Sequence, residues 1–558
     1  MPLDRRSFLT SASAAGIASL ATRALGAPAL PAATNPNDPL LSARIFNVRD
    51  FGAALDGKQD DSPAIMAAFN AMKLAGHPTG TLLIPGLARI AATIDLDGGY
   101  RNTTSEGQWS AGHGERFSVI VQGALRPDPG IKTAVHLHGH RGAYTDIHLD
   151  KGGKSTDVGL LCEDLDLCDI GVGATDFAGT VLRADASADA SKRIRSTKIR
   201  ELYASNCGRA VYWRAIEAFG SFQFIWDRNC VEGSQFEDCA DVTIQYFENF
   251  SPDTQTVGLN FVECNNFSVG ILSLGDRPKE ALVKITGGDF GSINKIRVSG
   301  HPHPPKGFQP PVGLKLVNVK SLNIDNLLTF RCGAGLHAIG SSFTIKRHHS
   351  LTGDVNPLLI EGSKEFPAPR MELGVLYRYH QRESVKIADN LAGGSLRLHG
   401  RMYDMNTSET PDLSAIDCRS EKLLLDVAGL TIEARATITK SISHPNPANV
   451  VGVSQARLAI PLVHGQITER QIALGAAIQN TSDRPLTLHI PVEFQPAKDA
   501  HSSCEILLGP TSEKLITVVS ARRPAPQTDT LTVRIPPWWW YRIEVKNASP
   551  GKAAAYFD

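Results

Sequence analysis

The chain has 558 residues, of which 42% are hydrophobic, so it is long enough and apolar enough to bury a large core. Its 57 basic and 57 acidic side chains balance, which argues against a nucleic-acid partner, because such proteins carry a strongly basic surface. No stretch beyond the first 33 residues approaches the roughly 18 uncharged apolar residues that a membrane span needs. We therefore expect a soluble globular protein without a transmembrane segment.

The N-terminus carries paired arginines followed by an apolar run. The run Arg5-Arg6-Ser7-Phe8-Leu9 precedes mildly apolar residues up to Leu20, and small residues follow as far as position 33. This order is typical of a twin-arginine export signal that is cleaved within residues 27–33. It predicts a mature protein that is periplasmic or secreted and that carries about two net negative charges once residues 1–33 are removed.

Residues 45–96 show a strand, a turn, a helix and two further strands in succession. Ser62 and Pro63 are suited to the start of a helix, and the acidic residues just before them favour a turn and the positive end of that helix over a catalytic site. Apolar residues then recur at helical spacing, at Ile65, Ala68, Phe69 and Met72. The pattern predicts one amphipathic helix that covers an apolar surface.

The order FNVRDFGAALDGKQDDSPAI, then a helix, then LLIPG, resembles the N-terminal module of the pectate-lyase-like superfamily. One departure is the shortened stretch at residues 85–89, which lacks a tyrosine that such modules tend to carry. The resemblance implies an all-β fold, a right-handed parallel β-helix closed at one end by the helix. It does not imply one activity, because the superfamily includes lyases, hydrolases, epimerases and phage tail proteins.

A repeat of 22 to 32 residues supports the solenoid in the middle of the chain. Two apolar columns can be aligned, the first at Leu259, Leu282, Leu314 and Leu336 and the second at Phe267, Phe290, Leu322 and Phe343. We expect about eight to ten rungs and a β-helix domain over residues 41–400. The nine cysteines show spacings close to a rung, which favours buried free thiols over disulfides, although one or two bridges are the alternative.

After residue 401 the short sequence repeat ends, and longer strands with alternating apolar and polar residues follow. We predict a separate C-terminal β-sandwich domain over residues 411–558. Its last strand contains Trp538, Trp539 and Trp540. Neighbouring strand residues point to opposite faces, so these rings either seal the domain or offer alternate rings to a sugar.

The first candidate site follows from alternation in the segment RGAYTDIHLD. Ile147 and Leu149 are expected inside, which places Tyr144, Asp146 and His148 on the outer face. A phenol, a carboxylate and an imidazole in a row can accept, orient and donate protons. A solvated strand face is the alternative interpretation.

The second candidate site is the segment FIWDRNCVEGSQFEDC, which mixes carboxylates, a guanidinium and an indole. Its candidate catalytic residues are Asp227, Arg228, Glu232 and Asp238, and Trp213 and Trp226 are candidate substrate-binding residues. Alternation places Trp226 on one face with Phe222 and Phe224, which favours a core position for all three rings over a stacking platform. No metal site is expected, because the pairs His301/His303 and His348/His349 lack a third ligand, and calcium has no supporting motif.

Together these features predict an exported carbohydrate-active enzyme that cleaves a polysaccharide or an oligosaccharide substrate. We favour β-elimination on a uronic-acid glycan, with Tyr144 or His148 as the base and Arg228 neutralising the substrate carboxylate. A glycoside hydrolase with an Asp/Glu pair is the first alternative. An epimerase and a glycan-binding protein without catalysis are the others, and no cofactor is expected.

Overall fold

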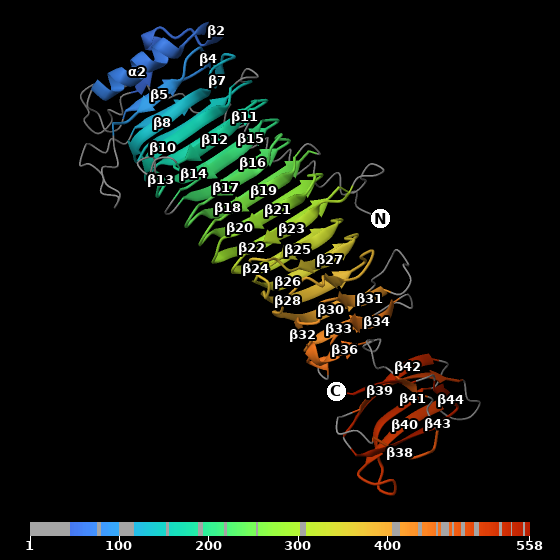
Figure 1. Ribbon diagram of the computed structural model, residues 1–558. Coiled ribbons are helices and arrows are strands. Elements are labelled where there is room, and N and C mark those ends of the chain that lie inside the picture. Colours follow the sequence, from blue (N-terminus) through green and yellow to red (C-terminus); the bar gives the residue numbers. More distant parts are fainter. Residues whose placement is uncertain are drawn as a thin grey trace, which may run out of the picture. The chain divides into compact units, whose positions relative to one another are not determined.

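The computed structural model describes most of the chain from Ile45 onward, and it forms a parallel β-solenoid followed by a smaller antiparallel domain (Figure 1). The predicted export signal and its cleavage region lie outside the described residues. The described residues are 45–74, 80–99, 117–151, 156–187, 194–216, 220–252, 255–301, 309–403, 413–433, 438–453, 456–458, 468–470, 474–480, 486–495, 502–523, 527–536, 538–550 and 553–557. Within these ranges no helix is long and apolar enough to cross a membrane.

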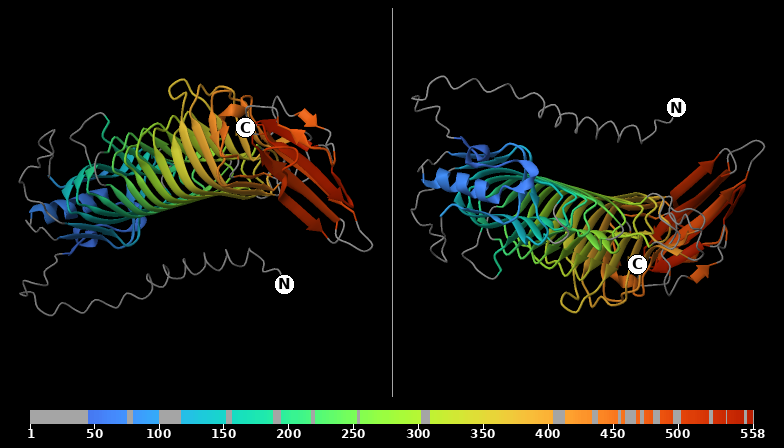
Figure 2. Two further views of the ribbon diagram at one scale, coloured as in Figure 1. Left: turned by 90° about the horizontal axis from the view of Figure 1, so that it is seen from below. Right: turned by 90° about the horizontal axis from the view of Figure 1, so that it is seen from above.

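Two parallel sheets make up the solenoid, and in each of them the strands of successive turns pair side by side (Figures 1 and 2). The larger, sheet A, has 21 strands. They are β1 (Ile45–Asn47), β2 (Asp56–Asp60), β3 (Thr81–Ile84), β4 (Leu87–Ile90), β6 (Ser118–Val121), β7 (Ala124–Pro127), β9 (Tyr144–Leu149), β11 (Asp169–Thr175), β14 (Lys198–Ser205), β16 (Ser221–Arg228), β18 (Thr243–Ser251), β20 (Ser268–Asp276), β22 (Gly291–Gly300), β24 (Leu322–Phe330), β26 (Phe343–Thr352), β28 (Arg370–Arg378), β30 (Ser395–Tyr403), β32 (Leu424–Asp426), β33 (Leu430–Glu433), β35 (Val450–Val451) and β36 (Arg457–Leu458).

The second sheet, sheet B, has 15 strands, so the solenoid contains more rungs than the eight to ten expected. Its strands are β5 (Ile94–Asp97), β8 (Thr133–Arg141), β10 (Val158–Asp166), β12 (Thr180–Asp185), β13 (Ile194–Arg195), β15 (Arg209–Arg214), β17 (Ser234–Glu237), β19 (Val257–Val262), β21 (Ala281–Thr286), β23 (Val312–Val317), β25 (Ala334–Ile339), β27 (Asn356–Glu361), β29 (Val385–Ile387), β31 (Leu413–Cys418) and β34 (Ile438–Ser443). Their parallel pairing confirms the predicted fold class.

One α-helix, α2 (Ser62–Leu74), is present in the described residues and packs at the first turns of the solenoid. Its predicted apolar stripe is buried, since Ile65, Ala68, Phe69 and Met72 are at most 2% exposed. Just before the helix, Asp61 is also buried, and its carboxylate accepts hydrogen bonds from the backbone N–H groups of Ala54 and Leu55. These contacts agree with a structural role for the acidic residues at the start of the helix.

The solenoid continues past the boundary predicted at residues 400–411. Strand β31 pairs in parallel with β29 and β34, and β33 pairs in parallel with β36, which ends at Leu458. The described strands between residues 413 and 458 therefore belong to the β-helix and not to the C-terminal domain. Short strands such as β32 and β35 carry too few residues to show the repeat in the sequence.

The C-terminal domain consists of two antiparallel sheets, as expected for a β-sandwich-like domain. One sheet holds β37 (Thr468–Arg470), β39 (Leu486–Phe494), β42 (Gln527–Ile535), β44 (Ala548–Pro550) and β45 (Ala553–Phe557), and the other holds β38 (Ile478–Gln479), β40 (Ser502–Gly509), β41 (Ile516–Arg523) and β43 (Trp540–Lys546). Its own apolar core includes Phe494 and Ile543. Trp538 and Trp539 remain exposed, whereas Tyr541 is buried.

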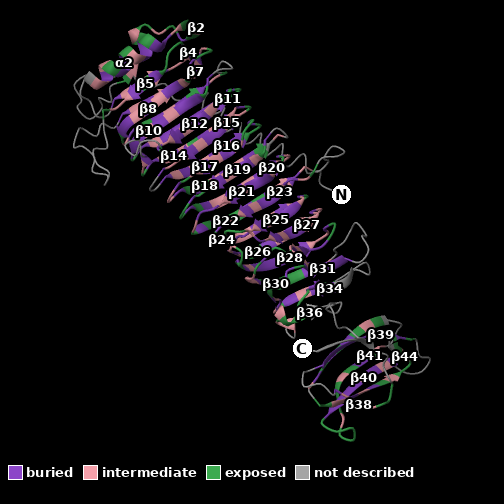
Figure 3. Ribbon diagram, in the orientation of Figure 1, coloured by how far each residue is buried: buried purple, intermediate pink, exposed green. Residues whose placement is uncertain are grey.

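The solenoid interior is filled by apolar side chains. Figure 3 shows buried residues recurring along the strands of every turn. All nine cysteines are free and buried, which confirms the expectation of buried thiols. The predicted apolar columns are correct in part, because Leu314 and Leu336 pair, as do Leu322 and Phe343. Phe290 was expected inside, but it lies in a turn with a φ of 57° and is 69% exposed.

Candidate functional site

On sheet A, inward and outward side chains do not alternate strictly along every strand. In β16, Phe222 and Ile225 are buried, so the two residues between them both lie outside the core. Strand β18 repeats the arrangement, with Ile244 and Phe247 buried. Because of this shift, Phe224 and Trp226 lie on the outer face, and the expectation that they share the core with Phe222 is wrong.

The first candidate site lies on the outer face as predicted. In β9, Ile147 and Leu149 are buried, whereas Tyr144 is 38% exposed and His148 is also exposed. The Oδ1 atom of Asp146 lies 3.6 Å from Nε2 of His148. The carboxylate can therefore orient the imidazole ring, which suits a proton-transfer role.

A cation that is not among the predicted site residues lies beside Tyr144. The guanidinium of Arg200, from β14, lies 4.5 Å from the centre of the Tyr144 ring. It is held in place by Asp169, whose Oδ1 accepts a 2.5 Å bond from Nη1, and it also reaches the backbone oxygen of Thr145. Arg200 thus bridges over β11 and places a positive charge next to the phenol.

Two glycines of β11 make room for this arrangement. Gly171 pairs with Asp146 and Gly173 pairs with His148, so both stand between β9 and β14. A Cβ atom at Gly171 would come within 2.6 Å of the Arg200 guanidinium and 3.1 Å of Asp146. The absence of side chains here lets groups from two different strands meet above β11. We call Tyr144, Asp146, His148 and Arg200 the β9 site.

Aromatic rings continue the same face on the following strands. Tyr203 pairs with Trp226 along the sheet, and their ring centres are 5.2 Å apart in an edge-to-face contact. Phe224 stacks on Tyr246 with an interplanar angle of 1°. Burial and a hydrogen bond to Glu248 raise the pKa of Tyr246 to about 12, so this ring stays a neutral phenol. We call Tyr203, Phe224, Trp226 and Tyr246 the aromatic strip.

The residues predicted for the second candidate site do not lie together on one surface. Asp227 is fully buried, and its Oδ2 accepts a 2.7 Å hydrogen bond from Ser234, so its nomination as a surface catalytic residue is wrong. Burial raises its pKa to about 6. The alternation shift described above is the reason, because it turns Asp227 inward.

The remaining residues of that segment are spread out. Glu232 precedes β17 and forms an ion pair with Arg209, whereas Asp238 follows the last residue of β17, in a turn with a φ of 51°. Arg228 lies over the rings of Trp226 and Phe250, at 6.0 and 5.7 Å from their centres. These positions do not provide the carboxylate pair that a hydrolase needs.

Trp213 is a core residue and not a substrate-binding one. Its side chain is 0% exposed and makes an edge-to-face contact with Phe222 at 5.1 Å. Trp226, by contrast, is partly exposed in the aromatic strip, which is compatible with its nomination. Arg200 and Tyr203 were not predicted from the sequence, although both belong to the segment IRELY, which carries charged and aromatic groups at outward positions.

The histidines considered as metal ligands lie elsewhere. His348 is fully buried, its pKa is lowered to about 3 by burial, and its Nδ1 lies 2.8 Å from the hydroxyl of Tyr377. His303 lies outside the described residues. A different group, formed by Asp95, His136 and His138, does bring three ligand atoms within 4.8 Å of one another.

The fold and this face define a parallel β-solenoid on which the β9 site lies on the same outer face as a row of aromatic rings. No protein-family model matches the sequence. Over 121 residues the chain is 32% identical to mannuronan C5-epimerase AlgE3 of Azotobacter vinelandii, a match that covers 21% of this chain and 6% of that protein. The chain thus spans a small part of the length of its curated relative.

Among solved structures, the chain is similar to the A-module of the mannuronan C-5 epimerase AlgE6 of Azotobacter vinelandii. That alignment has a TM-score of 0.29 and 14% identity and covers 74% of this chain and 99% of the module. A mutant tailspike protein of E. coli bacteriophage HK620, in complex with a pentasaccharide, aligns with a TM-score of 0.36 and 10% identity over 90% of this chain and 94% of its own. At these values neither likeness carries an argument about function.

Proposed function

We propose that this chain acts on a uronic-acid polysaccharide by removing the proton at C5 of a sugar unit. The observation that supports this most directly is the contact of Arg200 with Tyr144, because it combines a cation with a group that can exchange a proton. The proton next to a carboxylate becomes removable when a cation neutralises that carboxylate and stabilises the enediolate. Arg200 takes this role in place of Arg228, which lies beside Trp226.

The proposed step is proton transfer without change of oxidation state. Tyr144 or His148 takes the C5 proton, and the electron pair moves into the carboxylate, which Arg200 faces. The other of these two residues then donates a proton at the enediolate stage, either to the oxygen that leaves C4, which gives elimination, or to the opposite face of C5, which gives epimerisation. Asp146 is suited to orient His148 in both cases, since the two groups are 3.6 Å apart.

The similarity to a protein named mannuronan C5-epimerase supports a mannuronan-like substrate for this chain. It also raises epimerisation beside the elimination favoured from the sequence, because both reactions begin with loss of the same proton. A hydrolase receives less support, since Asp227 is buried and Glu232 and Asp238 lie at opposite ends of β17. The aromatic strip provides rings on which neighbouring sugar units can stack.

The substrate would meet this chain outside the cytoplasm. We base this part of the proposal on the twin-arginine pattern at Arg5 and Arg6 and on the apolar run that follows it. A fusion of residues 1–33 to a reporter protein would be expected to reach the periplasm in wild-type cells and to stay inside cells that lack the twin-arginine translocase.

The activity is tested with the purified full chain on mannuronan, guluronan, polygalacturonate and a neutral glucan. Ultraviolet absorbance of the unsaturated uronate reports elimination, and proton NMR of the recovered polymer reports epimerisation. We expect activity on at least one acidic polymer and a loss of about a hundredfold or more in kcat for Tyr144→Phe and Arg200→Gln.

The matched control is Arg370→Gln, which removes an exposed arginine from β28 of the same sheet and should leave kcat unchanged. Reducing ends without unsaturated product would instead identify a hydrolase. Binding of the polymer without any product would identify a glycan-binding protein. Either result would contradict the proposal.

A further inference from the structure

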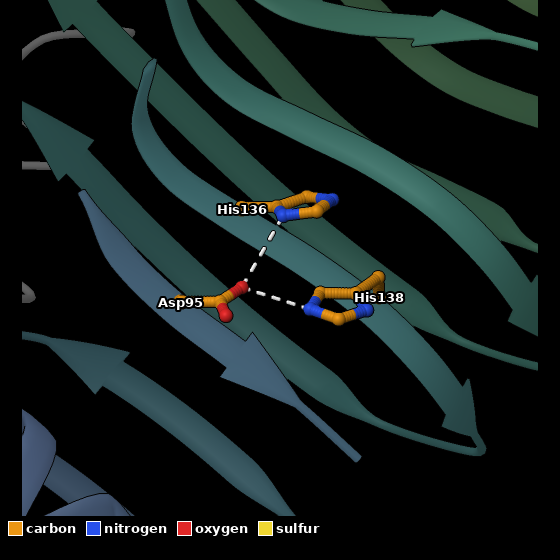
Figure 4. A group of neighbouring side chains, drawn as sticks. All are labelled: Asp95, His136 and His138. Carbon is orange, nitrogen blue, oxygen red and sulfur yellow. Dashed lines mark hydrogen bonds and ion pairs between the residues drawn. The ribbon is translucent and has the colours of Figure 1, made fainter. Parts of the chain in front are cut away.

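A group of two histidines and one aspartate lies on the outer face of sheet B. Strand β8 alternates so that His136 and His138 point outward together, while Leu137 between them is fully buried. Asp95, on the neighbouring strand β5, is the register partner of His136. Figure 4 shows both imidazole rings directed toward the carboxylate of Asp95.

The ligand atoms of these three residues converge. The Oδ1 atom of Asp95 lies 3.2 Å from Nδ1 of His136 and 2.8 Å from Nε2 of His138, and all three atoms lie within 4.8 Å of one another. The two rings are stacked with their centres 4.1 Å apart, which fixes their common direction. A divalent ion at about 2.0 to 2.2 Å from each ligand needs only small adjustments of these side chains.

A second layer of carboxylates faces the outer nitrogens of the same rings. Nε2 of His136 lies 3.1 Å from Oε2 of Glu163, on β10, and Nδ1 of His138 lies 3.8 Å from Oδ1 of Asp97. Histidines that bind a metal usually donate their other N–H to a carboxylate or carbonyl, which fixes the tautomer and turns the lone pair toward the ion. His136 has that arrangement through Glu163, whereas Asp97 is too far from His138 for a direct hydrogen bond and contributes only a nearby negative charge.

Without a bound cation, the donors and acceptors of a neutral His136 ring do not match the groups around it. Carboxylates stand at both of its nitrogens, yet a neutral imidazole has one N–H and one lone pair. One lone pair then faces a carboxylate oxygen, unless the ring is protonated or a cation lies between Nδ1 and Asp95. A bound metal ion satisfies that lone pair and the Asp95 oxygen together.

We propose that Asp95, His136 and His138 bind one divalent first-row transition-metal ion, with Glu163 positioning the imidazole of His136. Two nitrogen ligands and one oxygen ligand suit zinc, copper or nickel better than calcium or magnesium, which take oxygen ligands. Three protein ligands leave a position for water or for an oxygen of a ligand. Asp95 has a side chain that is 55% exposed, so an ion can enter from solvent.

The proposal departs from the expectation that the chain binds no metal, which rested on other histidine pairs. It is independent of the proposed catalytic activity, because the residues belong to sheet B and not to the β9 site. An ion here would join β5 and β8 directly and β10 through Glu163, so it would tie three successive turns together.

The test is calorimetric titration of zinc chloride into the full chain, prepared without a histidine tag and freed of metal by a chelator. We expect one equivalent of zinc per chain. Asp95→Asn and His138→Gln should raise the Kd about a hundredfold, and Glu163→Gln about tenfold, because it leaves the three ligands in place. Cobalt in place of zinc should give the visible absorption bands of a low-coordinate site, and these should be lost in His138→Gln.

The matched control is His337→Gln, which removes a largely buried histidine of sheet B whose Nε2 lies 3.2 Å from Oε1 of Glu361. It should leave the zinc Kd unchanged. Absence of saturable binding would overturn the proposal. Binding that survives both Asp95→Asn and His138→Gln would overturn it as well, and circular dichroism shows whether each variant is folded.

Discussion

Gly171 is the residue on which the geometry of the β9 site depends most. Its backbone does not need glycine for a positive φ, so alanine is acceptable to the strand itself. The added Cβ would stand 2.6 Å from a guanidinium nitrogen of Arg200, which must then move away from Tyr144. The glycine is therefore explained by the site and not by the fold.

We predict that Gly171→Ala lowers kcat by about ten- to a hundredfold while the thermal unfolding midpoint stays close to that of the wild type. Gly173→Ala should have a smaller effect, because its Cβ would lie 3.2 Å from Nδ1 of His148 and needs a shift of only a few tenths of an ångström. Steady-state kinetics and calorimetry of both variants provide the measurement. Equal activity of Gly171→Ala and wild type would show that Arg200 does not act from this position.

The titration of Asp227 predicts how the stability of the folded chain depends on pH. Burial raises its pKa to about 6 in the folded chain, against about 3.9 for an unfolded one. Between these two values the unfolded state releases its proton first, so the contribution of Asp227 to stability falls as pH rises from about 4 to about 6 and stays constant above. The total loss is on the order of 3 kcal/mol.

Asp227→Asn removes this titration. We expect the variant to gain stability relative to the wild type as pH rises through that window, in urea unfolding followed by circular dichroism. Ser234→Ala should enlarge the fall, because the Ser234 hydroxyl donates to the carboxylate and favours its charged form. A difference between Asp227→Asn and wild type that does not change with pH would contradict the prediction.

At the residue scale, strict alternation placed the side chains of β9 correctly. The same rule failed in β16, where two consecutive residues lie outside the core. Each later side chain of the strand therefore points to the face opposite to the one expected. That is why Trp226 was assigned to the core and Asp227 to the surface. Arg200 escaped notice because its partner Tyr144 is 56 positions earlier and meets it only through the stacking of rungs.

The aromatic strip belongs to the scale of elements, because it requires β14, β16 and β18 to place rings at matching positions. Trp226 is flanked by Tyr203 and Phe224, so its own ring is held in a fixed orientation. A ring fixed in this way can stack on a sugar with little loss of side-chain freedom. The strip continues the face that carries the β9 site.

We predict that Trp226→Ala weakens binding of the polysaccharide about three- to tenfold, as expected for loss of one stacked ring. The effect should appear in KM and in direct affinity measurements, with kcat less affected. Phe290→Ala, which removes an exposed ring in a turn, is the control and should bind like the wild type. Unchanged affinity of Trp226→Ala would mean that the glycan does not lie along this strip.

The sequence also indicated which elements exist more reliably than how they align. The helix α2 and its buried stripe were predicted from caps and spacing, which are local signals. The alignment of apolar columns was off by one at Leu282 and Phe290, since Leu259 pairs with Val283 and Gly291 with Leu322. A strand shows its register only through its neighbours, which lie a full turn away in the sequence.

At the scale of the whole molecule, the solenoid is held by a continuous apolar interior that includes eight of the nine buried cysteines, while Cys504 lies in the core of the C-terminal domain. Burial raises the pKa of Cys168 to about 12, and those of Cys418 and Cys504 to about 11. A thiol reacts as its thiolate, so these cysteines should be inert in the folded protein.

Because all nine cysteines are buried, we predict that a thiol reagent such as Ellman's reagent modifies none of them in the native chain near neutral pH. After unfolding in denaturant without reductant, all nine should react. Rapid reaction of one cysteine in the native state would contradict the burial. Fewer than nine reactive thiols after unfolding would reveal a disulfide.

The fold class was predictable because a parallel solenoid repeats its signals many times. The end of the solenoid was not, because the strands beyond residue 411 are short and their rungs irregular, as in β32 and β35. The candidate metal site was missed for a related reason. Asp95 and His138 are 43 positions apart, and only the stacking of β5 on β8 brings them together.

The central claim is that the β9 site removes the C5 proton of a uronic acid. The most direct measurement is release of tritium into water from a mannuronan labelled at C5, since both elimination and epimerisation require that step. We predict release by the wild type and a rate lowered about a hundredfold or more in Tyr144→Phe and Arg200→Gln. Product formation on mannuronan without release of the label, or release that both variants retain in full, would contradict the account.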